Sequence, residues 1–296
     1  MKKKIRFSMQ GQPTVVDGIK GQRMLPNKFA QAVGPFVLLD HIPSCNQSRD
    51  DSHKRDIRKC AHPYKGIATL TYIINGEVEH VDSMGNRVKL NSGGVHWMKA
   101  GKGVVHDEAI NTESKTTETD VSVVKCWLNL PSQHKCEDPN YLSLSEHTVP
   151  IQILKNNTGW IKILLGKYEN AIAKIPCYSQ QFLYHVHVEA RNQFSIATEN
   201  RLEYAAFLPK DNAVINDTEF GASELIVFDT DGEVIEINNY SKIAIDIFLF
   251  GGEPYTEPII LDGTFVMNTP HEITQAYNDY YDGKYGDISS ERNDAT

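Results

Sequence analysis

Two short segments of the chain carry side chains of the kinds that bind transition metals. His62 and Tyr64 lie in the sequence CAHPY, directly before an apolar run, and His106 and Glu108 lie in the sequence HDE, after the glycine-rich turn AGKGVV. Side chains alternate along an extended chain, so each pair projects from one face of its segment. Two antiparallel strands that bring these faces together would place two imidazoles and a carboxylate around one point. That donor set leaves coordination positions open on non-haem iron, and nickel, copper or manganese can also occupy it.

Short strands are the elements that would have to position these side chains. Residues 67–74 (IATLTYII) are rich in β-branched and aromatic types and end at an Asn-Gly pair, which is typical of hairpin turns. Residues 77–81 are the expected return strand of that hairpin, and residues 121–130 (VSVVKCWLNL) form a further strand. The pattern therefore places the candidate segments within antiparallel sheets.

The second half of the chain repeats this style and ends in a helix. Strands are predicted at 160–165, 182–188, 203–208, 224–228, 234–237 and 244–250. Thr269 and Pro270 are suited to be the cap and the first residue of a helix that continues over 271–281. The polar tail GDISSERNDAT is expected to fray.

The polar segment 131–150 has the character of a crossover between two all-β halves. Many short strands with turns between them favour sandwiches or barrels. We therefore predict an all-β fold of two stacked β-barrels. The N-terminal barrel would comprise residues 1–135 and hold the metal site, and the C-terminal barrel would comprise residues 150–296, hold no metal, and carry the helix and the tail.

Other histidines and cysteines have less support as ligands. His185 and His187 form an HxH pair on a predicted strand, but the next histidine is His271 and no glutamate follows at a suitable spacing. We therefore expect this pair to face the surface. His80 follows the first predicted hairpin and is expected to be exposed, and Cys60 is expected to pack as a small thiol.

The composition is that of a globular protein, with 40% hydrophobic and 23% charged residues among 296, which excludes disorder over most of the chain. No stretch approaches the roughly 20 apolar residues of a membrane span, and no apolar segment follows the basic start as in a signal peptide. Five cysteines without a CxxC pair favour a reducing, cytoplasmic compartment. The net charge of −8, with basic clusters only at 2–4 and 53–59, argues against direct nucleic-acid binding.

Several segments together resemble the pirin family: HPYKGIATLTYIINGEVEH, GGVHWMKAGKGVVHDE, WLNLP and GGEPYTEPIILDGTFVMNTPHEITQA. The segment GPFVLLDHIP at 34–43 is also similar to the pirin N-terminus. The resemblance extends over residues 18–286. It implies a bicupin, that is, two cupin-type β-barrels in one chain with the metal in the N-terminal barrel.

The metal ligands of the family lie in the motif HPHRG and in a later HxE. Matched position by position, His62 is the first histidine ligand, and His106 and Glu108 are the third and fourth ligands. Tyr64 stands where the family has its second histidine. Further departures from the family pattern lie at Lys65, Ala68, Gly94 and His96. The resemblance therefore implies a site in which three ligands are kept and one is changed.

Tyr64 leaves several arrangements open. An unperturbed phenol has a pKa near 10, so a neutral tyrosine is a poor ligand. A cationic metal can lower the pKa of the phenol and bind the phenolate, which favours ferric iron. The phenol can instead donate a hydrogen bond to a metal-bound water. A third arrangement is a degraded site that Tyr64 fills, with metal binding weakened or lost.

The resemblance implies two alternative functions. Some pirin-like proteins have quercetin 2,3-dioxygenase activity, which implies a metal, iron before nickel, copper or manganese, that holds a flavonol-like aromatic substrate for reaction with dioxygen. Glu108 would then also accept the proton of the substrate hydroxyl. Other pirins are redox-responsive regulators, which implies a non-catalytic, metal- or redox-dependent protein that binds a transcription factor or a metabolic enzyme. We expect a monomer that contacts neither membranes nor nucleic acids.

Overall fold

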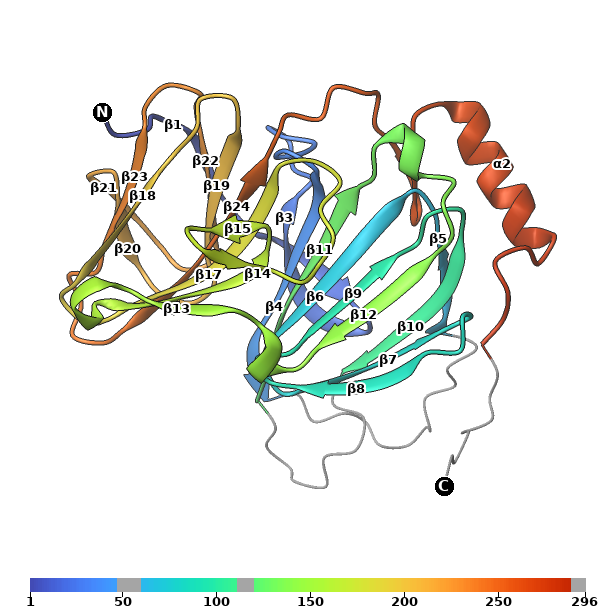
Figure 1. The fold of residues 1–296 in the computed structure, drawn as a ribbon, viewed down its shortest axis with the longest axis horizontal. Helices are drawn as coiled ribbons and strands as arrows, with labels where there is room; N and C mark the ends of the chain where they lie inside the picture. Colours follow the sequence, from blue (N-terminus) through green and yellow to red (C-terminus); the bar gives the residue numbers. More distant parts are fainter. Residues whose placement is uncertain (47–59, 111–119, 289–296) are drawn as a thin grey trace. The chain divides into compact units, whose positions relative to one another are not determined.

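The structure is a computed structural model in which residues 1–46, 60–110 and 120–288 are described. Within these residues the regular elements are mostly strands, and the α-helix α2 (Pro270–Tyr281) lies near the C-terminus (Figure 1). The predicted all-β class with a short C-terminal helix is therefore confirmed. No helix in this part of the chain is long and apolar enough to cross a bilayer.

The chain forms two compact units whose sequences interleave. Unit one comprises Met1–Pro43, Val124–Cys126 and Glu146–Tyr255, and unit two comprises Ser44–Val123, Trp127–Ser145 and Thr256–Thr296. One passage between the units, from Ser145 to Glu146, lies inside the segment 131–150 where a boundary is predicted. The division into sequential barrels at 1–135 and 150–296 stays a prediction.

Unit two, which contains the candidate metal ligands, is built from two groups of antiparallel strands. The first is a sheet in the order β5 (His62–Tyr64), β10 (Val104–Ile110), β7 (Glu77–Asp82) and β8 (Arg87–Asn91). The second group follows the order β12 (Asn140–Leu144), β9 (Val95–Lys99), β6 (Ile67–Asn75) and β11 (Asp120–Asn129). Unit two also contains a two-stranded sheet of β25 (Ile260–Asp262) and β26 (Phe265–Met267), the 3-10 helix η1 (Ser132–His134) and the helix α2.

The Asn75-Gly76 turn does not close the predicted hairpin. β6 pairs with β9, whereas β7 pairs with β8 and β10. Gly76 has a φ of 99°, which glycine adopts readily, and the turn leads the chain from one sheet into the other. Both predicted strands are present, but the prediction that they pair is wrong, because a turn signal fixes a change of direction and not the partner strand.

Helix α2 covers the outer face of the four-stranded sheet (Figure 1). Val81 of β7 and Val105 of β10 pack in one buried cluster with Phe265, Ile273 and Ala276, which come from β26 and α2. Because side chains alternate along a strand, residues on either side of these valines face the interior of the unit. The C-terminal segment therefore closes the back of the sheet that carries the candidate ligands.

The start of α2 follows the sequence prediction. Thr269 is the N-cap, its hydroxyl accepts a hydrogen bond from the backbone N–H of Glu272, and the Glu272 carboxylate accepts from the backbone N–H of Thr269. This capping box satisfies two amides that the helix would otherwise leave without partners. Farther along the helix, Asp279 forms an ion pair of 3.0 Å with Lys65, the residue that follows β5.

Unit one has its own buried core between sheets. Its largest sheet has the order β1 (Ile5–Gln10), β22 (Glu224–Phe228), β19 (Glu203–Leu208), β24 (Ile245–Gly252), β17 (Gln181–Val188), β14 (Gly159–Leu165) and β13 (Ile151–Ile153). Another sheet has the order β18 (Gln193–Ala197), β23 (Val234–Asn238), β20 (Ala213–Ile215) and β21 (Thr218–Phe220). Ile161, Val186, Ile235 and Leu249 are among the apolar side chains buried in this core.

The remaining elements of unit one include three consecutively paired strands, β2 (Gln12–Val16), β3 (Ile19–Leu25) and β4 (Phe36–Asn46), of which β4 continues into unit two after Pro43. The others are the short elements β15 (Lys167–Tyr168), β16 (Ala171–Ile172), η2 (Glu146–Thr148) and η3 (Lys155–Asn157). All the strands predicted at 160–250 are present, with ends within two residues of those predicted. Short runs rich in β-branched and aromatic residues, bounded by turn residues, were the signal for them.

His41 on β4 makes the stability of unit one sensitive to acid. Its side chain is 1% exposed, and its ring lies 5.1 Å from that of Phe207. Burial lowers the pKa of His41 from 6.5 to about 4, because an apolar surrounding disfavours the charged imidazolium. Between these two values the unfolded chain binds a proton that the folded protein does not. The free energy of unfolding therefore falls as the pH falls through this window.

We expect the substitution His41→Leu to remove this part of the acid sensitivity. From pH 7 to about pH 4 the wild type should lose up to about 3 kcal/mol of unfolding free energy more than the variant does. Denaturant unfolding of both proteins at several pH values measures the difference. The exposed His147, replaced in the same way, is the control, and equal pH slopes for wild type and His41→Leu would contradict the assignment.

Candidate metal centre

The candidate ligands project from the inner face of three neighbouring strands. β10 pairs with β5 so that His106 lies opposite His62, and β10 pairs with β7 so that Glu108 lies opposite His80. Residues directly opposite each other in antiparallel strands project to the same face, as do residues two apart on one strand. The fold therefore brings the two segments singled out in the sequence together on one surface and adds a residue from β7.

Three aromatic rings lie together at the β5 side of this surface. The ring of His106 is 5.2 Å from that of His62 and 4.5 Å from that of Tyr64, measured between centroids. His62 Nδ1 is 2.8 Å from the carbonyl oxygen of Cys60, so a neutral His62 donates from Nδ1 and keeps its lone pair on Nε2. Tyr64 Oη lies 3.2 Å from that Nε2 and is the donor to it. Cys60 itself is partly buried.

His80 completes a group of metal-binding atoms, although the sequence analysis predicts it to be exposed. One ligand atom each from His80, His106 and Glu108 lie within 4.8 Å of one another, and the three side chains are at most 2% exposed. Bonds of about 2.1 Å to a shared ion would place such atoms about 3.0–4.2 Å apart, so side-chain movements of less than about 1 Å suffice. Two imidazoles and a carboxylate in a buried place fit a first-row transition metal.

The prediction that His80 is exposed is wrong, because its side chain lies on the inner, buried face of β7. Val78, His80 and Asp82 alternate along β7 and are all buried. The sequence EVEHVD contains this alternation, but it does not show that the polar residues share the inner face with the valine. His80 lies two residues after Val78, so the two side chains share a face of the strand. This spacing is the sequence signal that could have placed His80 on the inner face.

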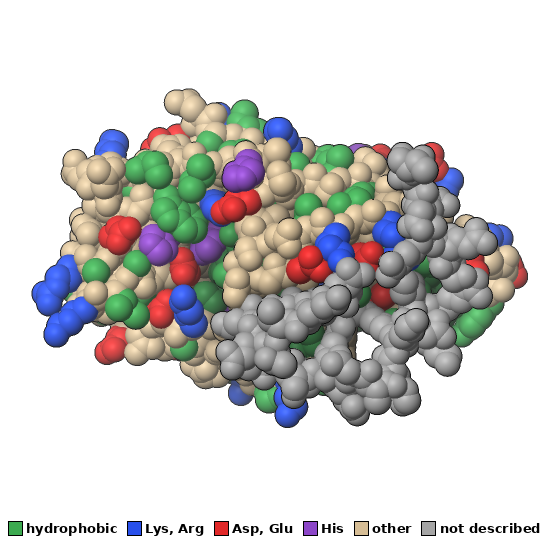
Figure 2. All heavy atoms as spheres, turned by 90° about the horizontal axis from the view of Figure 1, so that it is seen from below, with side chains coloured by type: hydrophobic (Ala, Val, Ile, Leu, Met, Phe, Trp, Pro, Cys, Tyr) green, Lys and Arg blue, Asp and Glu red, His purple; other side chains and the backbone are tan. Residues whose placement is uncertain are grey.

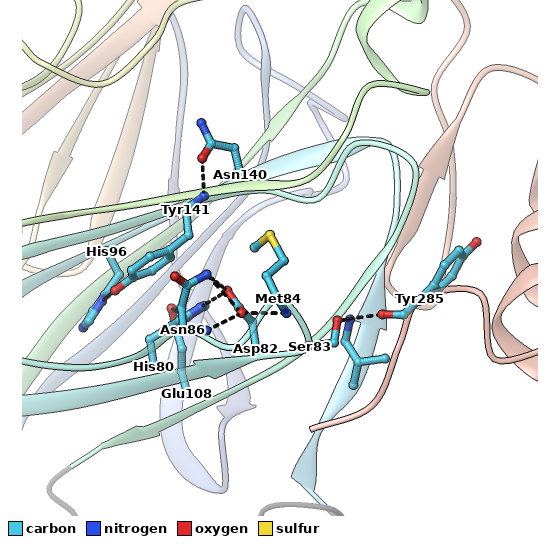
Figure 3. Close-up of polar contacts among 11 residues, drawn as sticks. His80, Asp82, Ser83, Met84, Asn86, His96, Glu108, Asn140, Tyr141 and Tyr285 are labelled. Atoms are coloured by element: carbon cyan, nitrogen blue, oxygen red, sulfur yellow. Dashed lines mark hydrogen bonds and ion pairs between the residues drawn. The ribbon is translucent and has the colours of Figure 1, made fainter. Parts of the chain in front are cut away.

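Asp82 holds the ring of His80 in place (Figure 3). His80 Nε2 lies 3.0 Å from Asp82 Oδ2, and Asp82 accepts further hydrogen bonds from the backbone N–H groups of Met84 and Asn86 and from the Asn86 side chain. A carboxylate on the far nitrogen of a histidine is the usual orienting partner of a metal ligand. Burial acts to lower the pKa of His80, but the hydrogen bond to Asp82 and the nearby negative charge of Glu108 outweigh it and raise that pKa.

Glu108 presents its two oxygens to different partners. Oε2 accepts a hydrogen bond of 2.8 Å from the hydroxyl of Thr71 on β6, and Oε1 lies 3.5 Å from His80 Nδ1. The carboxylate is therefore fixed from the second group of strands in the unit. One oxygen is anchored and the other faces the histidine.

Tyr141 and His96 support the other side of His80 (Figure 3). The ring of Tyr141 is stacked on that of His80, 4.3 Å away at an interplanar angle of 14°. His96 Nε2 donates to the carbonyl oxygen of Val78 at 3.1 Å, so its Nδ1 accepts from Tyr141 Oη at 2.6 Å. Burial raises the pKa of Tyr141 and keeps it a donor.

The histidine pair of unit one forms a different cluster. His185 Nε2 and His187 Nδ1 lie 3.1 Å and 2.8 Å from the same oxygen, Oδ1 of Asp246. His187 is partly exposed and stacks on Trp160, whereas His185 is 4% exposed and stacks on Phe248. The prediction of a surface-facing pair is therefore wrong for His185, because an aromatic side chain of the neighbouring strand covers it.

The N-terminal lysine cluster is neutralised by acidic partners. Lys2 forms ion pairs with Asp217 and Glu236, and Lys4 forms one with Asp231. The basic cluster at 53–59 lies outside the described residues. On the face seen in Figure 2, basic and acidic side chains are interspersed over the coloured part of the surface. A duplex nucleic acid would meet carboxylates beside these amines.

Comparison with known proteins supports the assignment of the fold. The Pirin family matches residues 18–128, and the Pirin C-terminal cupin domain matches residues 183–286. A pirin-like protein of Caulobacter vibrioides is 28% identical over 281 residues, which are 94% of this chain and 97% of that protein.

Solved structures agree with these matches. The quercetin 2,3-dioxygenase from Acinetobacter baumannii is 26% identical, with a TM-score of 0.88 and coverage of 98% of this chain and 100% of that chain. The bacterial pirin YhhW from Escherichia coli in complex with nickel(II) shares the fold at 17% identity, with a TM-score of 0.63 and coverage of 84% and 99%. With both cupin domains matched and a buried His/His/Glu cluster on its strands, the chain is a bicupin that belongs to the pirin family.

Proposed function

We propose that the protein is a metal-dependent oxygenase of the quercetin 2,3-dioxygenase type, which acts on small flavonol-like aromatic molecules. The observation that carries the proposal is the buried group of His80, His106 and Glu108, a donor set suited to non-haem iron. The similarity to a protein named quercetin 2,3-dioxygenase over the whole chain supports the substrate class. Iron is the metal we expect first, before nickel, copper or manganese.

The ligands of the metal come from more than one strand in this proposal. His106 and Glu108 bind it from β10, and a further ligand comes either from β5, where His62 and Tyr64 lie, or from β7, where His80 lies. A bound metal would hold the substrate oxygens and polarise them for reaction with dioxygen.

Glu108 is the proposed acceptor of the substrate hydroxyl proton. In this proposal Oε1 faces His80 and Oε2 accepts the proton, and the Thr71 hydroxyl keeps Oε2 in position. A positioned carboxylate in a buried site removes such a proton far better than one in water, because its geometry is fixed before reaction. His106 and Glu108 are both almost fully buried, and a buried site favours the exclusion of water that competes with the substrate.

Oxygen consumption with quercetin tests the proposal. We expect iron-loaded protein to consume dioxygen and to bleach the quercetin absorbance in air, and chelator-stripped protein to do neither until metal is returned. His187→Ala, which removes a histidine of unit one, is expected to keep the full rate. Equal rates for loaded and stripped protein would overturn the proposal and would favour a non-catalytic, metal- or redox-dependent binding protein.

A further inference from the structure

We propose that His80 of β7, and not Tyr64 of β5, completes the metal-binding set with His106 and Glu108. The inference rests on one part of the proposed function, namely that unit two binds a metal ion. It assigns the ion to the β7 side of β10 and gives Tyr64 a role as hydrogen-bond donor instead of ligand.

The first argument is the short gap between His80 and Glu108. His80 Nε2 interacts with Asp82, and Nδ1 makes no hydrogen bond to any residue that the structure describes. This nitrogen faces Glu108 Oε1 at 3.5 Å, which is longer than the usual N–H···O distance of about 2.7–3.2 Å. Two ligands of one ion, each about 2.1 Å from it, lie about 3.0–4.2 Å apart, depending on the angle between the two bonds. The separation therefore suits an ion between the two atoms.

The second argument is that His80 is held in the orientation a ligand needs. Asp82 fixes Nε2, and the stacked ring of Tyr141 fixes the plane of the imidazole. Asp82 is itself held by the backbone of Met84 and Asn86. A ligand that is oriented before the metal arrives loses little entropy on binding, so the position of Nδ1 favours coordination.

The third argument concerns Tyr64 and His62, which satisfy each other. His62 Nδ1 is engaged by the carbonyl oxygen of Cys60, and the Tyr64 hydroxyl lies 3.2 Å from His62 Nε2. An ion on this side would have to break that hydrogen bond, and it would also have to deprotonate a phenol whose ordinary pKa is near 10. An ion at His80 Nδ1 would break no hydrogen bond to a described residue and would not have to deprotonate a phenol.

Substitutions of His80 and Tyr64 separate the two ligand sets. We expect His80→Ala and His80→Gln to weaken nickel or iron binding by at least about 100-fold, since even outer partners of a ligand are worth about 10–100-fold. Tyr64→Phe should change the affinity by less than about 3-fold, and the ferric wild type should show no phenolate-to-iron charge-transfer absorption. Calorimetric titration and visible absorption measure these results. Thermal unfolding checks that each variant is folded.

A measurement on the wild type covers the case in which the His80 variants do not fold. Nitrogen-15 NMR of histidine-labelled, zinc-loaded protein shows which ring nitrogen each histidine gives to the metal. His80 should bind through Nδ1, because Asp82 engages its Nε2, whereas a bound His62 would use Nε2. Zinc on His62 Nε2 with His80 unchanged would overturn the inference.

The outcomes distinguish the inference from the proposed function. Metal that binds the wild type, is lost in His106→Ala and stays in His80→Gln refutes the role of His80 and leaves the proposed function intact. Loss of metal in Tyr64→Phe also refutes the inference. Wild-type protein that takes up neither iron nor nickel nor zinc refutes both.

Discussion

Replacing His106 with alanine will empty the metal site. The rings of His62, Tyr64 and His80 lie 5.2, 4.5 and 5.6 Å from that of His106, so every ligand set considered above includes it. Loss of a ligand should cost more than the about 10–100-fold that outer partners contribute. Metal content by mass spectrometry on tag-free protein should fall from about one ion per chain to less than about a tenth.

Two controls separate the loss of a ligand from the loss of the fold. His187→Ala should keep its metal, because that histidine lies in unit one and bonds to Asp246. Added metal should raise the unfolding temperature of the wild type and leave that of His106→Ala unchanged, since only a protein that binds the ion is stabilised by it. Full metal content in His106→Ala would show that the ion binds elsewhere.

Tyr64→His introduces the histidine that the resemblance to pirins implies at this position, and its metal content can be measured in the same way. Wild type that already holds about one ion would gain nothing from this change. Wild type that is empty and fills in Tyr64→His would show that the site has decayed in this chain, and attention would turn to protein partners.

Replacing Lys135 with methionine should strongly destabilise unit two. The side chain is 1% exposed, and its Nζ donates hydrogen bonds of 2.9 and 2.7 Å to the carbonyl oxygens of Gly66 and Val266 and a further one to Asn129 Oδ1. Methionine fills a similar volume but donates nothing, so buried acceptors lose a partner at about 1–3 kcal/mol each. We expect the free energy of unfolding to fall by about 3 kcal/mol or more.

The exposed Lys102 is the matched control for this prediction. Lys102 forms an ion pair with Asp138 at the surface, and surface pairs contribute about 0–1 kcal/mol, so Lys102→Met should be nearly neutral. Denaturant unfolding of the wild type and both variants measures the difference. A Lys135→Met protein as stable as Lys102→Met would show that these buried hydrogen bonds contribute nothing net to stability.

Much of the local structure was predictable from the sequence because its signals are local. Runs of strand-forming residues between turns predicted six strands of unit one to within two residues, and the Thr269-Pro270 pair predicted the start of α2. Alternation also predicted that His106 and Glu108 share a face of β10. The resemblance to pirins added the bicupin class, which no periodicity could supply.

The pairing of strands and the choice of inner face were not predictable in the same way. The Asn75-Gly76 turn looked like a hairpin, yet β6 and β7 pair with other strands. Partner choice depends on burial summed over whole sheets, which a two-residue signal does not contain. The same reason explains the wrong prediction for His80. Its polar side chain suggested exposure, but the register of β7 with β10 places it opposite the buried Glu108.

By itself, the sequence determined the strand-rich class, the family, the pairing of His106 with Glu108 on one face, and the capped helix. Only the tertiary structure decided that His80 and Asp82 join the buried surface, that Tyr64 bonds to His62, and that the C-terminal segment packs behind the candidate site. The physical reason is that the alternation of side chains along a strand determines which of them share a face, whereas the burial of that face depends on strands that are distant in the sequence.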